Sequence, residues 1–408
     1  MKQKLNICML LAESYDPKMP ARPSVMEMSK ILTRMGHGVT WVMPSEEGAK
    51  GIQERYYEGI RLLTIPCYTG SLLGRKIISK ILLVWKEVRL ASKVIHEKEC
   101  NIIQAREDIS GGLAAIYLKK RYKLPFVFQY SFPFVDSISE KHKSWSLRLL
   151  TAAGRFVLLH IMRQADLVLP VSELMRQGLA DKGILENKMM SLPLGVNTSL
   201  FSPANNTVNL RARYNLGNSS VMIYVGTLDK LRHLSILLFV LARVQRSCRR
   251  VKLLVLGQGD DRADLEKLSR NLGLENDVVF VGQVPYSEVP QFIAETDICL
   301  SLVPPTNLYK ANSPTKLFEY MSMGRPTVAN EGLYEHEVVL SESGSGVLVP
   351  FTAKTVAVAV VELLTNPERA SDMGWMGREW VLRNRSYETL TQLLEERYIE
   401  LLKKEKSK

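Results

Sequence analysis

The feature that most constrains the fold of this chain is an alternation between short apolar runs and stretches of helical periodicity. Short apolar runs bounded by turn residues are typical of buried strands, and the periodic stretches between them are typical of helices. Strands that alternate with helices form parallel sheets, because parallel neighbours need a long crossover connection. The chain has 408 residues, too many for one hydrophobic core, so the pattern predicts two doubly wound α/β domains.

The predicted strands fall into two groups. Those in the first half are Asn6–Leu11, Gly38–Met43, Arg61–Pro66, Ile102–Ala105, Phe126–Tyr130, Leu167–Val171 and Met189–Leu192. Those in the second half are Met222–Val225, Lys252–Leu256, Val278–Val281, Ile298–Leu302, Thr327–Ala329 and Gly346–Val349. We expect the join between the domains near Gly195–Asn206, which is rich in turn-forming residues.

The segment from Ser313 to Ala329 carries the most specific chemistry in the chain. A helix is expected to begin after Pro314, and it places Lys316 and Glu319 three residues apart on one face. A helix start presents free amide groups and the positive end of the helix dipole, which attract phosphate. Lys316 adds a positive charge, and Glu319 can accept hydrogen bonds from a ribose diol. The combination suits a nucleoside diphosphate, while an ordinary amphipathic helix of an α/β domain is the alternative.

The positive charge of the chain is concentrated in its first half. Residues 1–200 contain 29 lysines and arginines against 18 aspartates and glutamates, whereas residues 201–408 contain 25 against 24. This excess suggests an anionic partner for the first domain, either a membrane surface or a phosphate-bearing substrate. A generally basic proteome background is the alternative. Nucleic acid is not expected, because no aromatic–basic stacking pattern is present.

Two basic amphipathic stretches lie in the same half of the chain, Arg75–Ile95 and Ser146–Arg163. A basic helix with an apolar face can lie in a membrane interface. The same pattern describes any helix that flanks a parallel sheet, so the sequence leaves both interpretations open.

The cysteines and apolar runs bear on the compartment. The five cysteines are scattered and have no Cys-x-x-Cys spacing, which argues for a reducing compartment and against structural zinc. No apolar run reaches the length of about 18 residues that spans a bilayer, and the N-terminus lacks a signal peptide's apolar core. We therefore expect a cytoplasmic protein, peripheral at the inner face of the cell membrane.

Several further segments occur in a fixed order around Ser313–Ala329. They are Ala165–Glu173, Leu192–Pro203, Tyr224–Leu228, Leu256–Gly259, Val279–Pro285 and Gly344–Pro350. With them, the chain resembles the retaining glycosyltransferases of family four, which have the GT-B fold, over nearly its whole length. The Ser-Pro-x-Lys-x-x-x-Glu-Tyr-Met form of the donor motif resembles one branch of that family.

The resemblance implies two Rossmann-like domains that face each other across a cleft. Residues 1–200 would bind the acceptor, and residues 201–386 would bind the nucleotide-sugar donor. Residues 387–408 would form a helix that packs back on the first domain. The predicted helical stretch Tyr387–Lys404 agrees with this expectation.

The resemblance also implies how the donor is held. Arg232 and Lys316 would clamp the diphosphate, on which negative charge grows during transfer. Glu319 would hold the ribose, and the chain shows no Asp-x-Asp pair at a strand end, so we expect a metal-free route without a cofactor. The other residues assigned to the donor are Gly226, Thr227, Gly257, Gly259, Gln283, Val284, Asn312, Ser313, Pro314 and Thr315.

Two positions depart from the family pattern. Ala311 stands where the family has a first motif glutamate that contacts the donor sugar, so backbone amides at Asn312 and Ser313 are expected to replace it. Thr227 stands where relatives have an arginine after Gly226, which leaves one cation fewer near the phosphates. The base is expected against Gln283 and the residues that follow it.

On the acceptor side, Arg22 and the pair Arg106 and Asp108 follow predicted strands and would face the cleft of a doubly wound domain. The arginines could bind an acceptor phosphate, and Asp108 could orient a hydroxyl. Ion pairs within the loops are an equally good interpretation. We assign no histidine a catalytic role.

The resemblance therefore implies a retaining hexosyl- or N-acetylhexosaminyl-transferase. It would move a sugar from a UDP- or GDP-linked donor to a hydroxyl of a lipid-linked or surface-glycan acceptor, as in polysaccharide biosynthesis. Two alternatives stay open at this point. One is a nucleotide-sugar 2-epimerase of the same fold, and the other is a donor-binding scaffold that is catalytically degenerate.

Overall fold

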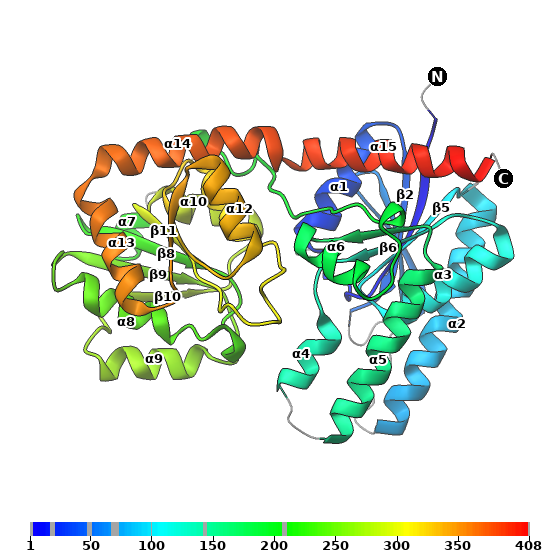
Figure 1. Cartoon of the computed structure of the whole chain (residues 1–408), viewed down its shortest axis with the longest axis horizontal. Helices are drawn as coiled ribbons and strands as arrows, with labels where there is room; N and C mark the ends of the chain where they lie inside the picture. The colour runs from blue at the N-terminus through cyan, green and yellow to red at the C-terminus, as the bar shows by residue number, and fades with distance from the viewer. Residues whose placement is uncertain are drawn as a thin grey trace. The chain divides into compact units, whose positions relative to one another are not determined.

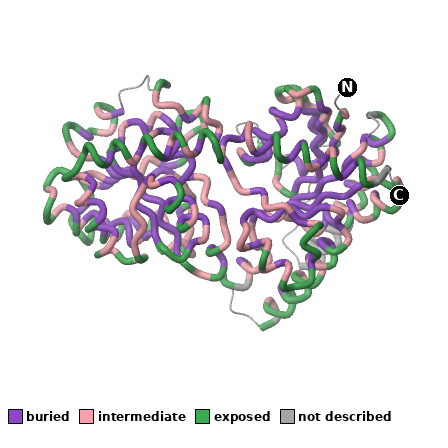
Figure 2. Tube along the Cα trace, turned by 45° about the horizontal axis from the view of Figure 1, so that its top comes forward, coloured by how far each residue is buried: buried purple, intermediate pink, exposed green. Residues whose placement is uncertain are grey.

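In a computed structural model the chain forms two compact units, shown in Figure 1. The first unit consists of Met1–Pro193 with Tyr387–Lys408, and the second of Leu194–Ser386. The structure describes residues 3–16, 21–46, 51–66, 73–98, 100–141, 145–205 and 210–406. In each unit the buried residues follow the strands, while exposed residues lie on the outer helices (Figure 2).

The first unit is built on a seven-stranded sheet in the order β3-β4-β2-β1-β5-β6-β7. The strands are β1 Asn6–Leu11, β2 Gly38–Pro44, β3 Gln53–Tyr57, β4 Ile60–Ile65, β5 Ile102–Arg106, β6 Phe126–Tyr130 and β7 Leu167–Pro170. All neighbouring pairs are parallel except β3 with β4. The strand order reverses at β1, because the chain runs outward through β2 and later returns beside β1 as β5.

One predicted strand of this unit is absent, and one strand was not predicted. The segment Met189–Leu192 is not a strand, because it pairs with β7 only through an isolated bridge between Val168 and Met189. The strand β3 was missed, because its side chains are charged or half exposed and give no apolar run.

Helices cover both faces of the first sheet. They are α1 Pro23–Arg34, α2 Leu73–Lys98, α3 Ile109–Tyr122, α4 Phe134–Lys141, α5 Trp145–Gln164, α6 Glu173–Ala180 and α15 Tyr387–Lys406. The helices α1 and α15 share one hydrophobic core with alternate residues of β1, whereas α3 lies against the opposite face, where Gly111 touches Leu10. Among the helices that the structure describes, none has an apolar stretch long enough to cross a bilayer.

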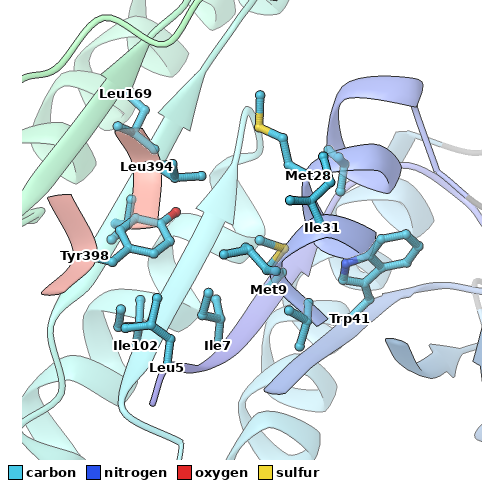
Figure 3. Packing of buried hydrophobic residues seen from close by; sticks show 14 of the residues in the cluster. Leu5, Ile7, Met9, Met28, Ile31, Trp41, Ile102, Leu169, Leu394 and Tyr398 are labelled. Atoms are coloured by element: carbon cyan, nitrogen blue, oxygen red, sulfur yellow. The ribbon is translucent and has the colours of Figure 1, made fainter. Parts of the chain in front are cut away.

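The final helix α15 is anchored to the first unit by apolar and polar contacts. Figure 3 shows Leu394 and Tyr398 beside core side chains from the strands. The Tyr398 hydroxyl donates to Oε1 of Gln104 at 2.6 Å, and both side chains are buried. Glu395 Oε1 lies 2.8 Å from Nε2 of His37, whose Nδ1 accepts from the Leu5 amide. The expected return of the last helix to the first unit is therefore confirmed.

The second unit contains a six-stranded parallel sheet in the order β10-β9-β8-β11-β12-β13. Its strands are β8 Ser220–Val225, β9 Val251–Leu256, β10 Val278–Gly282, β11 Ile298–Ser301, β12 Thr327–Asn330 and β13 Gly346–Val349. Its helices are α7 Leu210–Arg213, α8 Ser235–Val244, α9 Arg262–Asn271, α10 Val289–Ala294, α11 Thr315–Ser322, α12 Tyr334–Ser343, α13 Ala353–Thr365 and α14 Pro367–Asn384. The strand order reverses between β8 and β11.

The anchoring of α15 leads to a prediction about stability. Tyr398→Phe removes the only hydroxyl in this contact and leaves Oε1 of the buried Gln104 with one hydrogen bond fewer. We expect a loss of about 1–3 kcal/mol in the free energy of unfolding, the scale for a buried polar group that loses its partner. Urea denaturation measures it, with Tyr117→Phe on the exposed face of α3 as the matched control. Equal stability of the two variants would contradict the assignment.

Candidate functional site

The candidate site of the second unit lies where the strand order reverses, the usual place for ligands in open parallel sheets. Gly226 directly follows β8, and Lys316 is the second residue of α11. They are neighbours, because a Cβ atom on Gly226 would lie 3.1 Å from Nζ of Lys316. Gly226 also has a φ of 152°, which disfavours any other residue.

Lys316 is the most unusual residue of this site. Its side chain is 6% exposed, and within the described part of the chain its Nζ atom has no hydrogen-bond partner. Its Nζ atom lies 3.6 Å from the centroid of the Tyr224 ring, where the charged form makes a cation–π contact. Burial and the nearby charge of Arg232 lower the pKa of Lys316 well below its usual value.

Arg232 ends a short 3₁₀ helix, Lys230–Arg232, which follows β8. Its guanidinium carbon lies 5.4 Å from the ring centroid of Tyr309, in the loop before α11. The charge of Arg232 acts on both neighbours: burial raises the pKa of Tyr224 and Arg232 partly opposes that rise, whereas Arg232 adds to the lowering of the pKa of Lys316 that burial causes. The two predicted clamp residues are therefore brought together, with aromatic rings beneath them that sequence reasoning missed.

Glu319 lies one turn further along α11 and is also buried. Burial raises the pKa of its carboxyl to about 7, although the Tyr286 hydroxyl donates to Oε1 at 3.0 Å and Lys316 acts in the opposite direction. Tyr286 belongs to the segment after β10 that contains Gln283 and Val284. The predicted base-binding segment therefore adjoins the predicted ribose-binding residue.

The glycines after β9 have a structural explanation that the sequence did not reveal. A Cβ atom on Gly257 would lie 1.9 Å from the carbonyl oxygen of Gly226, and one on Gly259 would lie 2.1 Å from that of Leu228. The amide of Gly226 already donates to the carbonyl of Leu256. Gly257 and Gly259 allow the adjacent loops to touch. Because the amide of Gly226 is already used, Gly226 leaves room for a ligand but does not donate a hydrogen bond to it.

The loop between β11 and α11 contributes further polar groups. Within the described residues, the side-chain oxygens of Thr306 and Asn312 are buried and have no hydrogen-bond partner. Ser313 is used internally, since its hydroxyl accepts from the Leu194 amide and donates to Glu335. Pro314 caps α11 without a side-chain bond, so the amide groups of the first turn, from Thr315 on, have no side-chain cap.

The predicted acceptor residues lie where the strand order of the first unit reverses, between β1 and β5. Arg22 and Arg106 share the carboxylates of Glu13 and Glu107 in four ion pairs of 3.2–3.6 Å. Sequence reasoning missed both glutamates, although each stands just after a strand end. Asp108 caps α3, because its Oδ2 accepts from the Gly111 amide and from the Ser110 hydroxyl.

Comparison with known families covers most of the chain. Residues 23–200 match the family described as Glycosyltransferase Family 4, and residues 208–380 match Glycosyl transferases group 1. The GDP-mannose-dependent alpha-(1-6)-phosphatidylinositol monomannoside mannosyltransferase of Mycolicibacterium smegmatis is 28% identical over 251 residues, 60% of this chain and 64% of that protein. The alpha-monoglucosyldiacylglycerol synthase of Streptococcus pneumoniae is 21% identical over 87% of this chain and 77% of its own.

A solved structure supports the architecture. Sucrose-phosphate synthase from Thermosynechococcus elongatus superposes with a TM-score of 0.77 at 19% identity, covering 97% of this chain and 99% of that one. The GT-B fold expected from the sequence is confirmed. The epimerase alternative is not favoured, because the two relatives named above are a transferase and a glycolipid synthase.

The burial of Lys316 predicts that an anionic ligand binds together with a proton. Burial and Arg232 lower the pKa of the amine, and a bound diphosphate raises it again. At a pH above the lowered pKa, the protein therefore takes up a proton when the diphosphate binds. Calorimetry of UDP and GDP binding in buffers with different protonation enthalpies measures this, at a pH well above the value of about 7 for Glu319. The uptake should vanish in Lys316→Met, and binding heats independent of buffer would contradict the prediction.

Proposed function

We propose that this chain, which belongs to the glycosyl transferases group 1 family, moves a hexosyl or N-acetylhexosaminyl group from a nucleotide sugar to a hydroxyl group. The observation that carries this proposal is the buried Nζ of Lys316, which lacks a hydrogen-bond partner among the described residues and adjoins Arg232. Burial and Arg232 disfavour the charge of Lys316, while Glu319 supports it only in part, so a diphosphate supplies the further negative charge that a buried cation needs.

Lys316 and Arg232 stabilise the charge that develops on the leaving diphosphate. Glu319, with Tyr286 beside it, holds the ribose, and the segment that begins at Gln283 holds a uracil or guanine base. The two cations supply the charge that a metal ion supplies elsewhere, so the proposed route needs no metal. Transfer proceeds with retention, in which the acceptor hydroxyl attacks from the leaving-group side and the phosphate takes its proton.

The proposed acceptor is a lipid-linked glycan or glycolipid. Two relatives support it by name, since one acts on phosphatidylinositol monomannoside and the other makes a glucosyldiacylglycerol. The cluster of Arg22, Arg106, Glu13 and Glu107 offers hydrogen-bond donors and acceptors in balanced charge. We therefore assign it to acceptor hydroxyl groups rather than to a phosphate.

The helix α5 supports a peripheral position on an anionic membrane, at the inner face of the cell membrane. Its inner face buries Leu158, Ile161 and Met162, as a sheet-flanking helix requires. Four large apolar side chains lie outside that face and are exposed by 62–75%, namely Trp145, Leu149, Leu150 and Phe156. Arg148 and Arg155 are exposed on the same helix, a combination suited to an anionic lipid interface.

The donor assignment is tested with Lys316→Ala and Arg232→Ala. Each should weaken binding of the nucleoside diphosphate and slow transfer by about 10²-fold or more, the scale for loss of one preorganised donor group. A thermal-shift screen against UDP, GDP, ADP, TDP and CMP identifies the nucleotide. Lys354→Ala, an exposed lysine on α13, is the control. Near-normal transfer in both site variants would exclude this clamp.

The membrane assignment is tested by flotation with vesicles that contain anionic phospholipid. The double variant Leu149→Ser and Leu150→Ser should lose most binding, because each exposed leucine contributes transfer free energy on entering the interface. Val358→Ser is the control, as Val358 is 61% exposed on α13 of the second unit. Binding of the double variant at the wild-type level, or no binding by the wild type, would refute the assignment.

A further inference from the structure

The loop of residues 302–314, between β11 and α11, is held by three consecutive residues at the start of α12. We call Tyr334, Glu335 and His336 the α12 clamp. The Tyr334 amide donates to the carbonyl of Lys310, in the middle of the loop, at 3.0 Å. Through their side chains, His336 binds Ser301, the strand residue that directly precedes the loop, and Glu335 binds Ser313 near the end of the loop.

His336 holds the strand residue from which the loop starts. Its Nδ1 lies 2.9 Å from the carbonyl oxygen of Asn330, which can only accept, so Nδ1 carries the hydrogen. Its Nε2 lies 3.0 Å from the hydroxyl of Ser301, the last residue of β11, and accepts from it. Burial lowers the pKa of His336 to about 4, which keeps the ring neutral and Nε2 an acceptor. Asn330 reinforces this end, since its Oδ1 accepts from the Val303 amide at 2.8 Å.

Glu335 holds the end of the loop. Its Oε2 accepts from the Ser313 hydroxyl at 3.2 Å and lies 3.5 Å from Nη2 of Arg385. Ser313 in turn accepts from the Leu194 amide, so it is fixed from two directions. Glu335 and Ser313 are both buried, and a buried carboxylate keeps such contacts because nothing in an apolar interior replaces them.

The residues that face the diphosphate are held by other elements. α11 is fixed by its core residues Leu317 and Phe318 and by Tyr320, whose hydroxyl accepts from the Val225 amide at the end of β8. Among the described residues Lys316 makes no hydrogen bond to the α12 clamp, although its charge helps to lower the pKa of His336. The hydrogen bonds that hold the helix and those that hold the loop therefore come from different elements.

We propose that the α12 clamp positions the 302–314 loop for recognition of the donor sugar, without touching the donor itself. The loop carries the buried side-chain oxygens of Thr306 and Asn312, which lack partners among the described residues and lie in the segment just before Lys316. They take the place of the carboxylate that Ala311 does not supply. This inference rests on the proposed function, because it requires that the site hold a nucleotide sugar.

The test separates binding of the nucleotide from recognition of the sugar. Glu335→Gln and His336→Ala should leave the Kd of the nucleoside diphosphate within about twofold, while kcat/KM for the matching nucleotide sugar falls at least about tenfold, as expected for a misplaced contact. UDP with UDP-glucose and GDP with GDP-mannose are the probes, and release of diphosphate is followed. Ser341→Ala, exposed on the same helix, is the control.

A positioning role also predicts partial rescue. The amide oxygen of His336→Gln can accept from Ser301, so this variant should retain more activity than His336→Ala. Hydrogen exchange should become faster in peptides from 302–314 and stay unchanged around Lys316.

Equal weakening of diphosphate and nucleotide sugar, or no effect on either, would overturn the clamp. Glu335→Gln, which is nearly isosteric, decides the question if His336→Ala does not fold. Failure of the wild type to bind any nucleoside diphosphate would instead refute the proposed function.

Discussion

The chemistry of the second unit depends on one buried cation, the side chain of Lys316. Its contacts are an aromatic face at 3.6 Å and the neighbouring charge of Arg232, and both the burial and that charge favour the neutral amine. A bound anion reverses this balance, because an opposite charge in a poorly solvated place interacts strongly. Glu319 already favours the charged form, and under the proposed function a diphosphate adds the larger part of this stabilisation.

Both units have their candidate residues at the point where the strand order reverses, but the charge balance of the two sites differs. In the first unit the cations Arg22 and Arg106 are matched by two carboxylates, whereas Lys316 in the second has no anionic hydrogen-bond partner among the described residues. A balanced cluster suits neutral hydroxyl groups and a cation without an anionic hydrogen-bond partner suits phosphate, which is why we propose the first site for the acceptor and the second for the donor.

The sequence predicted the features that depend on neighbours along the chain and missed those that depend on distant ones. Apolar runs located the central strands, because their residues are buried on both faces, but β3 has half-exposed side chains and gave no such signal. Lys316 and Glu319 were found from helix spacing. The contact of Glu335 with Ser313, or of Glu13 with Arg106, joins residues from separate loops, and no local pattern records it.

The separation of the two supports in the second unit has a consequence for specificity. The glycine loops and α11 form one rigid group, because close backbone contacts at Gly257 and the core position of Leu317 leave little freedom. The 302–314 loop is fixed through buried polar contacts of α12, which specify one arrangement as long as every partner is present. If the site holds a nucleotide sugar as we propose, substitutions in α12 or in the loop change which sugar fits while the diphosphate contacts stay intact. The contacts to the diphosphate, which all nucleotide sugars share, are then held by other elements than the contacts to the sugar.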